Sequence, residues 1–318
     1  MGTVAGIPSV AAVVLNYRRP KETAACVEAL MQSTLPPTSV VVVDNDSGDG
    51  SVAWLRSALP RVEIVESGKN RGYAGGMNVG VRRALLTDAA HILVLNSDTL
   101  VERATMALLV GELERDPSAG AATGTFYYSP ETTRIWYAGG DLVWWRANAV
   151  TRRSAPAGGV RESGVVQRVS FLTGCAILFR AASLRAAGLF DERFFMYQED
   201  AELCARFVMR GHRLLYVPRA VLYHKMTVDE ETPLKVYFTM RNRLLLLESA
   251  PNLWARWAGT AFYLAMACLK IVRWSLSDRV LFRAAHLGMQ DYARRRFHEG
   301  RGLLLLRRGH RADPLKER

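Results

Sequence analysis

Polar side chains stand directly after three apolar runs in the first hundred residues, where a ligand could be bound. The clusters are Asn16 and Tyr17 after 10–15, Asp44–Ser51 after 40–43, and Asn96 and Asp98 after 91–95. A carboxylate fixed at a strand end can hold Mg²⁺ or Mn²⁺, which accept one protein oxygen together with substrate phosphates. One such cluster alone is usually a helix cap or a turn. Three clusters at one sheet edge favour a ligand site, with Asp98 as the metal candidate.

Further along the chain, two segments could complete such a site. The glycine-rich segment Asn70–Asn78 opens a helix and could approach a phosphate or a sugar closely, although it matches neither GxGxxG nor a Walker motif. Glu199 and Asp200 follow an aromatic run, so burial would raise the pKa of a carboxyl there toward that of a general base. The ordinary explanation is a helix N-terminus with favourable charges.

A histidine and two arginines are weaker candidates. His224 ends a later apolar run and could be a second metal ligand, although a lone histidine is more often structural. Arg241 and Arg243 lie in a helical pattern and could clamp a diphosphate. A solvated helix face explains the two arginines equally well.

Alternating apolar runs and helical patterns must position these groups. We predict strands over 10–15, 40–43, 61–65 and 91–95, with helices over 21–32, 51–59 and 74–86 between them. Continuous β-branched runs are typical of parallel strands covered on both faces, and this order predicts a doubly wound α/β sheet. Ligands bind such sheets at the carboxyl ends of the strands.

The later pattern is less regular. It predicts a helix over 102–115, strands over 119–127, 176–180, 213–217 and 220–224, and helices over 181–187 and 201–210. Residues 129–167, rich in Gly, Pro, Trp and Arg, are expected to leave the core, as a hairpin over the ligand edge. From residue 231 onward the pattern is helical.

Composition excludes several classes of protein. The 318 residues are 49% apolar and 23% charged, a globular balance. The net charge of +12 is concentrated in residues 241–318, which hold 16 basic and 6 acidic residues. No nucleic-acid-binding motif accompanies this charge. The four scattered cysteines indicate neither disulfides nor zinc, and no signal peptide is expected.

Six segments in this order resemble the inverting glycosyltransferases of family 2, which have the GT-A fold, and especially the bacterial rhamnosyltransferase-like members. The resemblance spans about residues 10–245 and rests on Val13–Tyr17, Val41–Ser51, Asn70–Asn78, Leu95–Thr99, Thr173–Ala176 and Phe190–Arg206. It implies a catalytic domain over 1–245, with a mostly parallel sheet between helices, followed by a basic, aromatic-rich helical region over 246–318.

The resemblance also implies a role for each matching residue. Asp200 would be the catalytic base. Asp98 would hold Mg²⁺ or Mn²⁺ as the acid of the family's DxD motif, whose first acid is replaced here by Asn96, and His224 would be the other protein ligand. The residues expected to bind the nucleotide sugar are Asn16, Tyr17, Asp44, Asn45, Asp46, Asn70, Gly72, Asn78, Asn96, Thr173, Gly174, Glu199, Arg241 and Arg243.

The implied function is transfer of a sugar from a nucleoside-diphosphate sugar to a hydroxyl of a saccharide or lipid-linked saccharide in cell-surface polysaccharide synthesis. The expected donor is thymidine-diphosphate rhamnose, with a uridine-diphosphate sugar as second choice. Two alternatives are a non-catalytic sugar-nucleotide-binding scaffold of the same fold and a nicotinamide-dependent oxidoreductase, against which the missing GxGxxG counts.

The C-terminal region predicts a location. Residues 257–269 carry no charge but as a helix would span only about 20 Å of a hydrocarbon core about 30 Å thick. Aromatic and basic residues around this stretch suit the surface of an anionic leaflet. We therefore expect a cytoplasmic protein bound peripherally to the inner face of the cell membrane. The alternatives for this region are a helical cap on the core or a homodimer contact.

Overall fold

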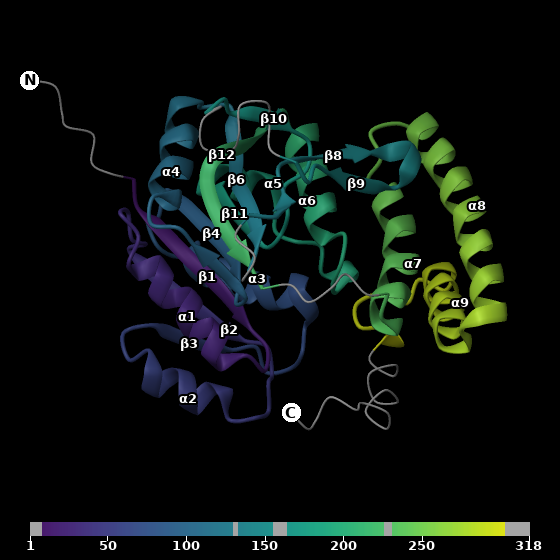
Figure 1. Cartoon of the computed structure of the whole chain (residues 1–318), viewed down its shortest axis with the longest axis horizontal. Helices are drawn as coiled ribbons and strands as arrows, with labels where there is room; N and C mark the ends of the chain where they lie inside the picture. Colours follow the sequence, from purple (N-terminus) through teal and green to yellow (C-terminus); the bar gives the residue numbers. More distant parts are fainter. Residues whose placement is uncertain (1–7, 130–132, 155–163, 226–230, 303–318) are drawn as a thin grey trace, which may run out of the picture.

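A single mixed sheet forms the centre of the protein. The computed structural model describes residues 8–129, 133–154, 164–225 and 231–302, and within these ranges ten strands pair in the order β10-β12-β6-β11-β4-β1-β2-β3, with β5 on β12 and β7 on β6 (Figure 1). The strands are β1 Val10–Asn16, β2 Ser39–Asp44, β3 Glu63–Glu66, β4 His91–Asn96, β5 Thr99–Val101, β6 Ala119–Tyr128, β7 Ile135–Tyr137, β10 Gln167–Val169, β11 Ala176–Arg180 and β12 Arg213–His224.

The parallel half of this sheet is the doubly wound arrangement expected from the sequence. β1 pairs in parallel with β2 and β4, and β2 with β3, so that Asn16 lies opposite Asp44 and Leu15 opposite Asn96. This register brings the polar residues that end β1, β2 and β4 to one edge. β11 then runs antiparallel between β4 and β6, which makes the sheet mixed.

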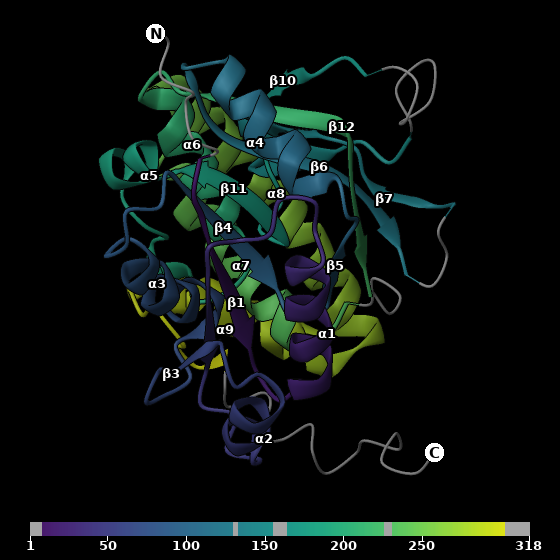
Figure 2. The same ribbon diagram turned by 90° about the vertical axis from the view of Figure 1, so that its left-hand side faces the viewer.

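Helices cover both faces of the sheet. Figure 2 shows α1 (Pro20–Met31) and α3 (Gly72–Ala84) on opposite sides of β1. The other helices before residue 230 are α2 Ser51–Ala58, α4 Thr105–Arg115, α5 Ala181–Ala187 and α6 Glu199–Met209. The apolar residues of strands and helices form one large core cluster, which is why the strand sequences are continuously apolar.

The short strands β5, β7 and β10 were not predicted, and one predicted pair of strands is continuous in the structure. The two strands expected over 213–217 and 220–224 are the single strand β12, whose pairing with β6 shifts register between Tyr216 and Val221. Pro218 interrupts the pattern there because it has no N–H to donate. The hydroxyl of Thr125 donates to the Pro218 carbonyl at 2.9 Å, so the strand continues past the proline.

The excursion after β6 contains a hairpin, as expected, but its far end does not cover the ligand edge. β8 (Gly140–Val143) and β9 (Asn148–Thr151) pair with each other across a 3₁₀ turn, η1 (Trp144–Arg146). This turn rests on α8 (Leu253–Ser277), where a Cβ added to Gly259 would lie 2.3 Å from the carbonyl oxygen of Trp144. The hairpin therefore joins the core to the C-terminal helices (Figure 1).

The C-terminal helices form a second apolar cluster that includes two buried residues from earlier in the chain. α7 (Pro233–Leu247), α8 and α9 (Arg279–Ala293) pack together with Ala147 and Phe195. The expected domain boundary at 245/246 falls inside α7, and Leu245 and Leu246 belong to the main core while Leu247 belongs to the second cluster. Among the described residues, no helix combines the length and apolar character needed to cross a bilayer.

Two glycines test the packing of this fold. A Cβ at Gly124 of β6 would lie 2.0 Å from the carbonyl oxygen of Ala220, whereas a Cβ at Gly111 of α4 meets nothing within 4 Å. We expect Gly124→Ala to lower the free energy of unfolding by about 1–3 kcal/mol through overpacking. Gly111→Ala should raise it by about 0.5–1 kcal/mol, because alanine favours the helix. Urea denaturation checks both, and equal stabilities would contradict the close approach of β6 and β12.

Candidate active site

The first polar group of the site is a fixed carboxylate at the end of β2. Asp44 is buried and accepts hydrogen bonds from the Asn16 amide at 2.6 Å and from the Ser47 N–H at 2.9 Å. The remaining oxygen of the Asn16 amide accepts from Thr23. Asn16 is therefore fully engaged inside the protein, and its observed function is to hold Asp44 rather than to face a ligand.

Asp44 borders a small polar cavity of about 190 Å³. It is lined by Asp44, Asp46, Gly48, Gly50, Ser51, Val52, Glu66 and Gly68. Asp46 is exposed at its rim, and Tyr17 is 37% exposed beneath the Arg18 guanidinium. Such a cavity can accept hydrogen bonds from hydroxyl or N–H groups. A larger, mostly apolar cavity of about 310 Å³ lies at the opposite end of β2, between α1 and α2, away from these side chains.

The segment from Asn70 to Gly72 links this edge to the later acidic pair. The Asn45 amide donates to Asn70 and to the Gly72 carbonyl, at 3.2 and 3.0 Å. Gly72 has φ +67°, and a Cβ there would lie 2.3 Å from the Phe195 carbonyl oxygen. Only glycine permits this approach, and it brings the chain before Glu199 against the start of α3.

Asp98 and His224 form the second part of the site. Oδ1 of Asp98 lies 3.1 Å from Nε2 of His224, and Oδ2 accepts from Arg19 at 2.9 Å. Burial alone would raise the pKa of Asp98, but the His224 ring and Arg19 lower it below the usual value. Burial would lower the pKa of His224, yet Cys175 and Asp98 raise it to about 10. The ring of Trp136 lies 4.9 Å from the His224 ring.

These two side chains fit a divalent cation. Two neighbouring ligands of an octahedral ion, each about 2.1 Å from it, are about 3.0 Å apart, close to the observed 3.1 Å between Oδ1 and Nε2. Nδ1 of His224 is buried without a hydrogen-bond partner. Within the described residues no group of three or more His, Cys, Asp or Glu side chains is arranged around an ion, so phosphates and water would supply the other ligands. An entering ion would displace the His224 proton.

The acidic pair Glu199 and Asp200 begins α6. Asp200 accepts hydrogen bonds from the Gly174 N–H at 2.9 Å and the Ala201 N–H at 2.8 Å. Burial raises the pKa of Asp200, and these N–H groups oppose that rise. Burial, then the adjacent Asp200 charge, raises the pKa of Glu199 well above its usual value, and Oε2 of Glu199 has no partner. Glu199 therefore holds its proton to a higher pH than an exposed glutamate does.

Tyr73 lies between the two parts of the site. Its hydroxyl donates to the Gly174 carbonyl. Its pKa is raised well above the ordinary value by burial, and further by Glu199, Cys175, Asp200 and Asp98. The Gly174–Cys175 segment connects these carboxylates, because the Gly174 N–H donates to Asp200 and the Cys175 sulfur lies 3.7 Å from Nε2 of His224, the partner of Asp98. Thr173, buried, accepts from the Cys175 N–H in the same segment, and the Asn96 amide contacts the Cys175 sulfur at 3.7 Å.

Three expected binding residues are placed differently. The Asn78 amide is buried and bonded to the backbone of Phe190 and to Glu192, so it braces α3. The Arg241 guanidinium is fully enclosed and donates to backbone carbonyls of residues 193, 194 and 298, not toward a diphosphate. Arg243 lies over the Tyr263 ring with its Nε buried and without a partner. Buried polar groups usually form hydrogen bonds within the protein, and the sequence does not show with which partners.

Four side chains that sequence reasoning did not assign belong to the site. They are Arg19, Tyr73, Trp136 and Cys175. Tyr73 and Cys175 lie within segments that were singled out, so their positions were a usable signal. Arg19 reaches the site from the turn after β1, and Trp136 reaches it from the excursion after β6. Spacing in the sequence predicts neither position.

The sheet edge thus combines a polar cavity, the Asp98–His224 pair that fits a divalent cation, and a buried acidic pair. The profile named "Glycosyl transferase family 2" matches residues 11–187. The chain is 30% identical over 262 residues to the galactofuranosyltransferase GlfT1 of Mycobacterium tuberculosis (strain CDC 1551 / Oshkosh), covering 77% of this chain and 84% of that protein. The chain belongs to glycosyl transferase family 2 and is an inverting glycosyltransferase.

Two further similarities agree with this assignment. The N-acetylglucosaminyl-diphospho-decaprenol L-rhamnosyltransferase of the same M. tuberculosis strain is 29% identical over 217 residues, which cover 62% of this chain and 70% of that protein. The crystal structure of GalNAc-T7 with UDP, GalNAc and Mn²⁺ superposes with a TM-score of 0.65 at 14% identity, covering 91% of this chain and 56% of that chain. The last similarity shows the GT-A-like fold.

The buried acid Glu199 gives a stability prediction. Its folded-state pKa lies above the ordinary value of about 4.3, so the folded protein keeps a proton that the unfolded chain loses, and stability falls as pH rises through this interval. Glu199→Gln cannot ionise. We expect this variant to have a higher Tm than the wild type at pH 8 and a similar Tm near pH 4. Each kcal/mol of difference in the free energy of unfolding shifts Tm by about 2–4 °C.

The matched control is Glu202→Gln on the same helix. Glu202 is also buried but is paired with Arg206 at 2.7 Å, so its replacement should lower Tm at neutral pH. Thermal unfolding followed by circular dichroism measures both variants. A Glu199→Gln variant that is no more stable than the wild type at pH 8 would contradict a neutral Glu199.

Proposed function

We propose that the chain transfers a sugar from a nucleoside-diphosphate sugar to a hydroxyl of a saccharide or lipid-linked saccharide in cell-surface polysaccharide synthesis, with Mg²⁺ or Mn²⁺ at Asp98 and His224. The single observation that carries this proposal is the Gly174–Cys175 segment: the Gly174 N–H donates to Asp200 at 2.9 Å, and the Cys175 sulfur lies 3.7 Å from Nε2 of His224, the partner of Asp98. A donor held at one carboxylate would thus have its acceptor near the other.

In this proposal Asp200 is the general base. Its two carboxylate oxygens are held by N–H groups of Gly174 and Ala201, which fixes the direction from which it takes the acceptor proton. Neutral Glu199 beside it adds no negative charge to repel the diphosphate. The acceptor oxygen then attacks the anomeric carbon opposite the leaving diphosphate, and this single displacement inverts the configuration.

The leaving side would use different groups. When bound at Asp98 and His224, the ion supplies Lewis acidity toward the diphosphate. Arg19, half exposed and paired with Asp98, is the cation nearest to that position, and it takes the place that sequence reasoning gave to Arg241. Asp44 and the cavity beside it would receive the nucleoside.

The donor is proposed from the relatives. The rhamnosyltransferase and galactofuranosyltransferase names support a bacterial cell-wall role and a saccharide acceptor on a lipid diphosphate. Thymidine-diphosphate rhamnose stays the first donor to test and a uridine-diphosphate sugar the second. A non-catalytic scaffold of the same fold is the alternative, and the presence of both Asp98 and Asp200 in one region argues against it.

Two asparagine variants separate binding from catalysis. Asp98→Asn should lose the Mn²⁺-dependent thermal shift produced by dTDP-rhamnose or UDP-sugars, because one of the two protein ligands is weakened. Asp200→Asn should keep that shift, but its rates of sugar transfer and of donor hydrolysis should both fall by about 10²–10⁴-fold, the usual contribution of a general base. The measurement is a sugar-nucleotide screen with and without metal, read by thermal shift and by nucleotide release.

Each variant can contradict its own assignment. Full transfer by Asp200→Asn would remove the base. An unchanged metal-dependent shift in Asp98→Asn would remove the metal site. A wild-type chain that binds donors but never turns them over would support the scaffold.

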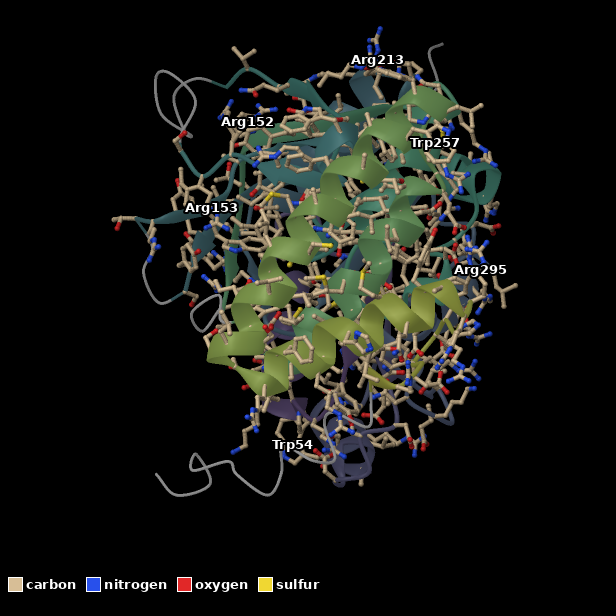
Figure 3. All side chains as sticks on the ribbon, turned by 90° about the vertical axis from the view of Figure 1, so that its right-hand side faces the viewer. Trp54, Arg152, Arg153, Arg213, Trp257 and Arg295 are labelled. Atoms are coloured by element: carbon tan, nitrogen blue, oxygen red, sulfur yellow. The ribbon has the colours of Figure 1, made fainter. Side chains whose placement is uncertain are left out.

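We also propose that α8 binds the cytoplasmic face of an anionic membrane. One side of α8, with Gly259, Tyr263, Ala267 and Trp274, is buried against the neighbouring helices. The opposite side exposes large apolar residues, namely Leu253, Trp254, Trp257, Leu269, Val272 and Leu276. Trp254 is 82% exposed and Trp257 69%. Figure 3 looks onto α8 and α9, with Trp257 near one end of α8.

Basic residues accompany this apolar side. Arg273 on α8 and Arg279 and Arg283 on α9 are exposed. Trp and Leu inserted at the headgroup boundary, with arginines beside anionic headgroups, are the features of a helix that lies in the membrane plane. A lipid-linked acceptor would then be delivered on the same side of the molecule as α8.

The tryptophans make this proposal testable. Replacing Trp254 and Trp257 together with alanine should weaken binding to phosphatidylglycerol vesicles at least about tenfold, because each buried side chain is worth about 1.5–3 kcal/mol. Trp54→Ala on α2, also exposed (40%), should have no effect. Vesicle flotation at low and high salt is the measurement. A wild-type chain that ignores anionic vesicles at low salt rules the membrane face out.

A further inference from the structure

The chain reaches Asp200 through an unusual turn. Phe195, Tyr197 and Gln198 have φ values of +65°, +67° and +73°. This left-handed region costs an L-residue other than Gly, Asn or Asp about 1–2 kcal/mol. Residues 194–198, hereafter the 194–198 turn, contain none of those three residue types. The turn must therefore be held by contacts from outside itself.

Two buried side chains of α7 supply those contacts. The Asn242 amide donates to the carbonyl oxygens of Phe194, Met196 and Tyr197 at 2.9, 2.8 and 2.7 Å. Nη2 of Arg241 also donates to the Phe194 carbonyl, at 2.8 Å. Both side chains are fully buried. The carbonyl oxygens that the left-handed residues turn inward are thus met by donors from one helix.

Arg241 also fixes the orientation of Asn242. Its Nε donates to the Asn242 Oδ1 at 2.9 Å, which leaves the amide nitrogen directed at the turn. Nη1 donates to the His298 carbonyl at 2.7 Å, and the guanidinium lies 4.9 Å from the centre of the Phe238 ring. Carbonyl oxygens and an aromatic face compensate a buried positive charge, and they connect the turn to the chain that follows α9.

The other side of the turn faces the start of α3. The Phe195 carbonyl accepts from the Ala74 N–H at 3.1 Å and lies over Gly72. The turn is thus held between α7 and α3. Gln198 leads directly into Glu199 and Asp200, so a rotation within the turn would move the Asp200 carboxylate relative to the Gly174 N–H that orients it.

We propose that Arg241 and Asn242 are positioning residues that hold the 194–198 turn so that Asp200 faces the acceptor hydroxyl. This inference rests on the proposed function of Asp200 as base. It gives the buried arginine of α7 a role in the transfer step without contact to the donor diphosphate. It also explains why the fully enclosed pair consists of polar side chains, which a purely apolar packing role would not require.

The test separates kcat from donor affinity. Asn242→Asp keeps the shape of the side chain but replaces the donor amide with an acceptor oxygen, and Arg241→Met removes the hydrogen-bond donors of the guanidinium. We expect kcat to fall about 10–100-fold in both, the usual effect of a misplaced catalytic group. The KM for the donor and the Kd of the nucleotide with Mn²⁺ should stay within about threefold. Arg241→Lys, which can still donate to a carbonyl, should recover part of kcat.

The control is Tyr263→Phe in the same apolar cluster. Tyr263 is buried and donates to the Met240 carbonyl at 3.1 Å without touching the turn. Tyr263→Phe should lower the stability of the protein but leave kcat unchanged when the assay temperature lies below the Tm of every variant. If Asn242→Asp does not fold, Arg241→Lys and Arg241→Met carry the comparison.

The outcomes are distinct. Variants that are folded and keep wild-type kcat, or that lose kcat and nucleotide affinity together, would overturn the positioning role. If kcat falls no further in these variants than in Tyr263→Phe, Arg241 and Asn242 only stabilise the fold, and the positioning role is overturned as well. A wild type without transfer, or an active Asp200→Asn, would instead indicate failure of the proposed function.

Discussion

The structure depends on the burial of two neighbouring carboxyl groups at the start of one helix. Withdrawing a carboxylate from water is strongly unfavourable unless N–H groups or cations replace the water. The Gly174 and Ala201 N–H groups do this for Asp200, whereas Glu199 responds by staying neutral. Gly174 can donate there because β11 follows it at a fixed place in the sheet, next to β4. The Gly174–Cys175 segment also connects this pair of acids to Asp98, which lies between β4 and β5, because the Cys175 sulfur is 3.7 Å from Nε2 of His224, the partner of Asp98.

The sequence was sufficient for the architecture of the first half because each signal there is local. Continuous apolar runs identify strands buried on both faces, and parallel register then carries Asn16, Asp44 and Asn96 to one edge. Strand 176–180 and helix 181–187 coincide with their predicted ranges. The expectation that Asp98, His224 and the acidic pair lie near one another rests on the family resemblance rather than on the local pattern. The break predicted between 217 and 220 does not occur, since Thr125 of β6 donates to the Pro218 carbonyl and the strand continues.

The functions of individual polar side chains were not predictable in the same way. Asn16, Asn78 and Arg241 have the residue types of ligand-binding groups, yet each forms its hydrogen bonds with protein partners, which are 1 to 114 residues away in the chain. Whether an amide faces a ligand or a backbone carbonyl depends on packing between distant elements, which spacing does not encode. The converse holds for Arg19 and Trp136, which enter the site only because the turn after β1 and the excursion after β6 return to it.

The division of α7 between two apolar clusters affects how this family can diversify. Leu245 and Leu246 pack with the main core while Phe238 and Leu247 pack with the C-terminal helices, so the seam between the halves runs lengthwise along one helix. The C-terminal helices are therefore not an independent unit that could be exchanged between related proteins. A chimaera joined near residue 245 would contain a helix whose side chains match only one of its two neighbouring clusters.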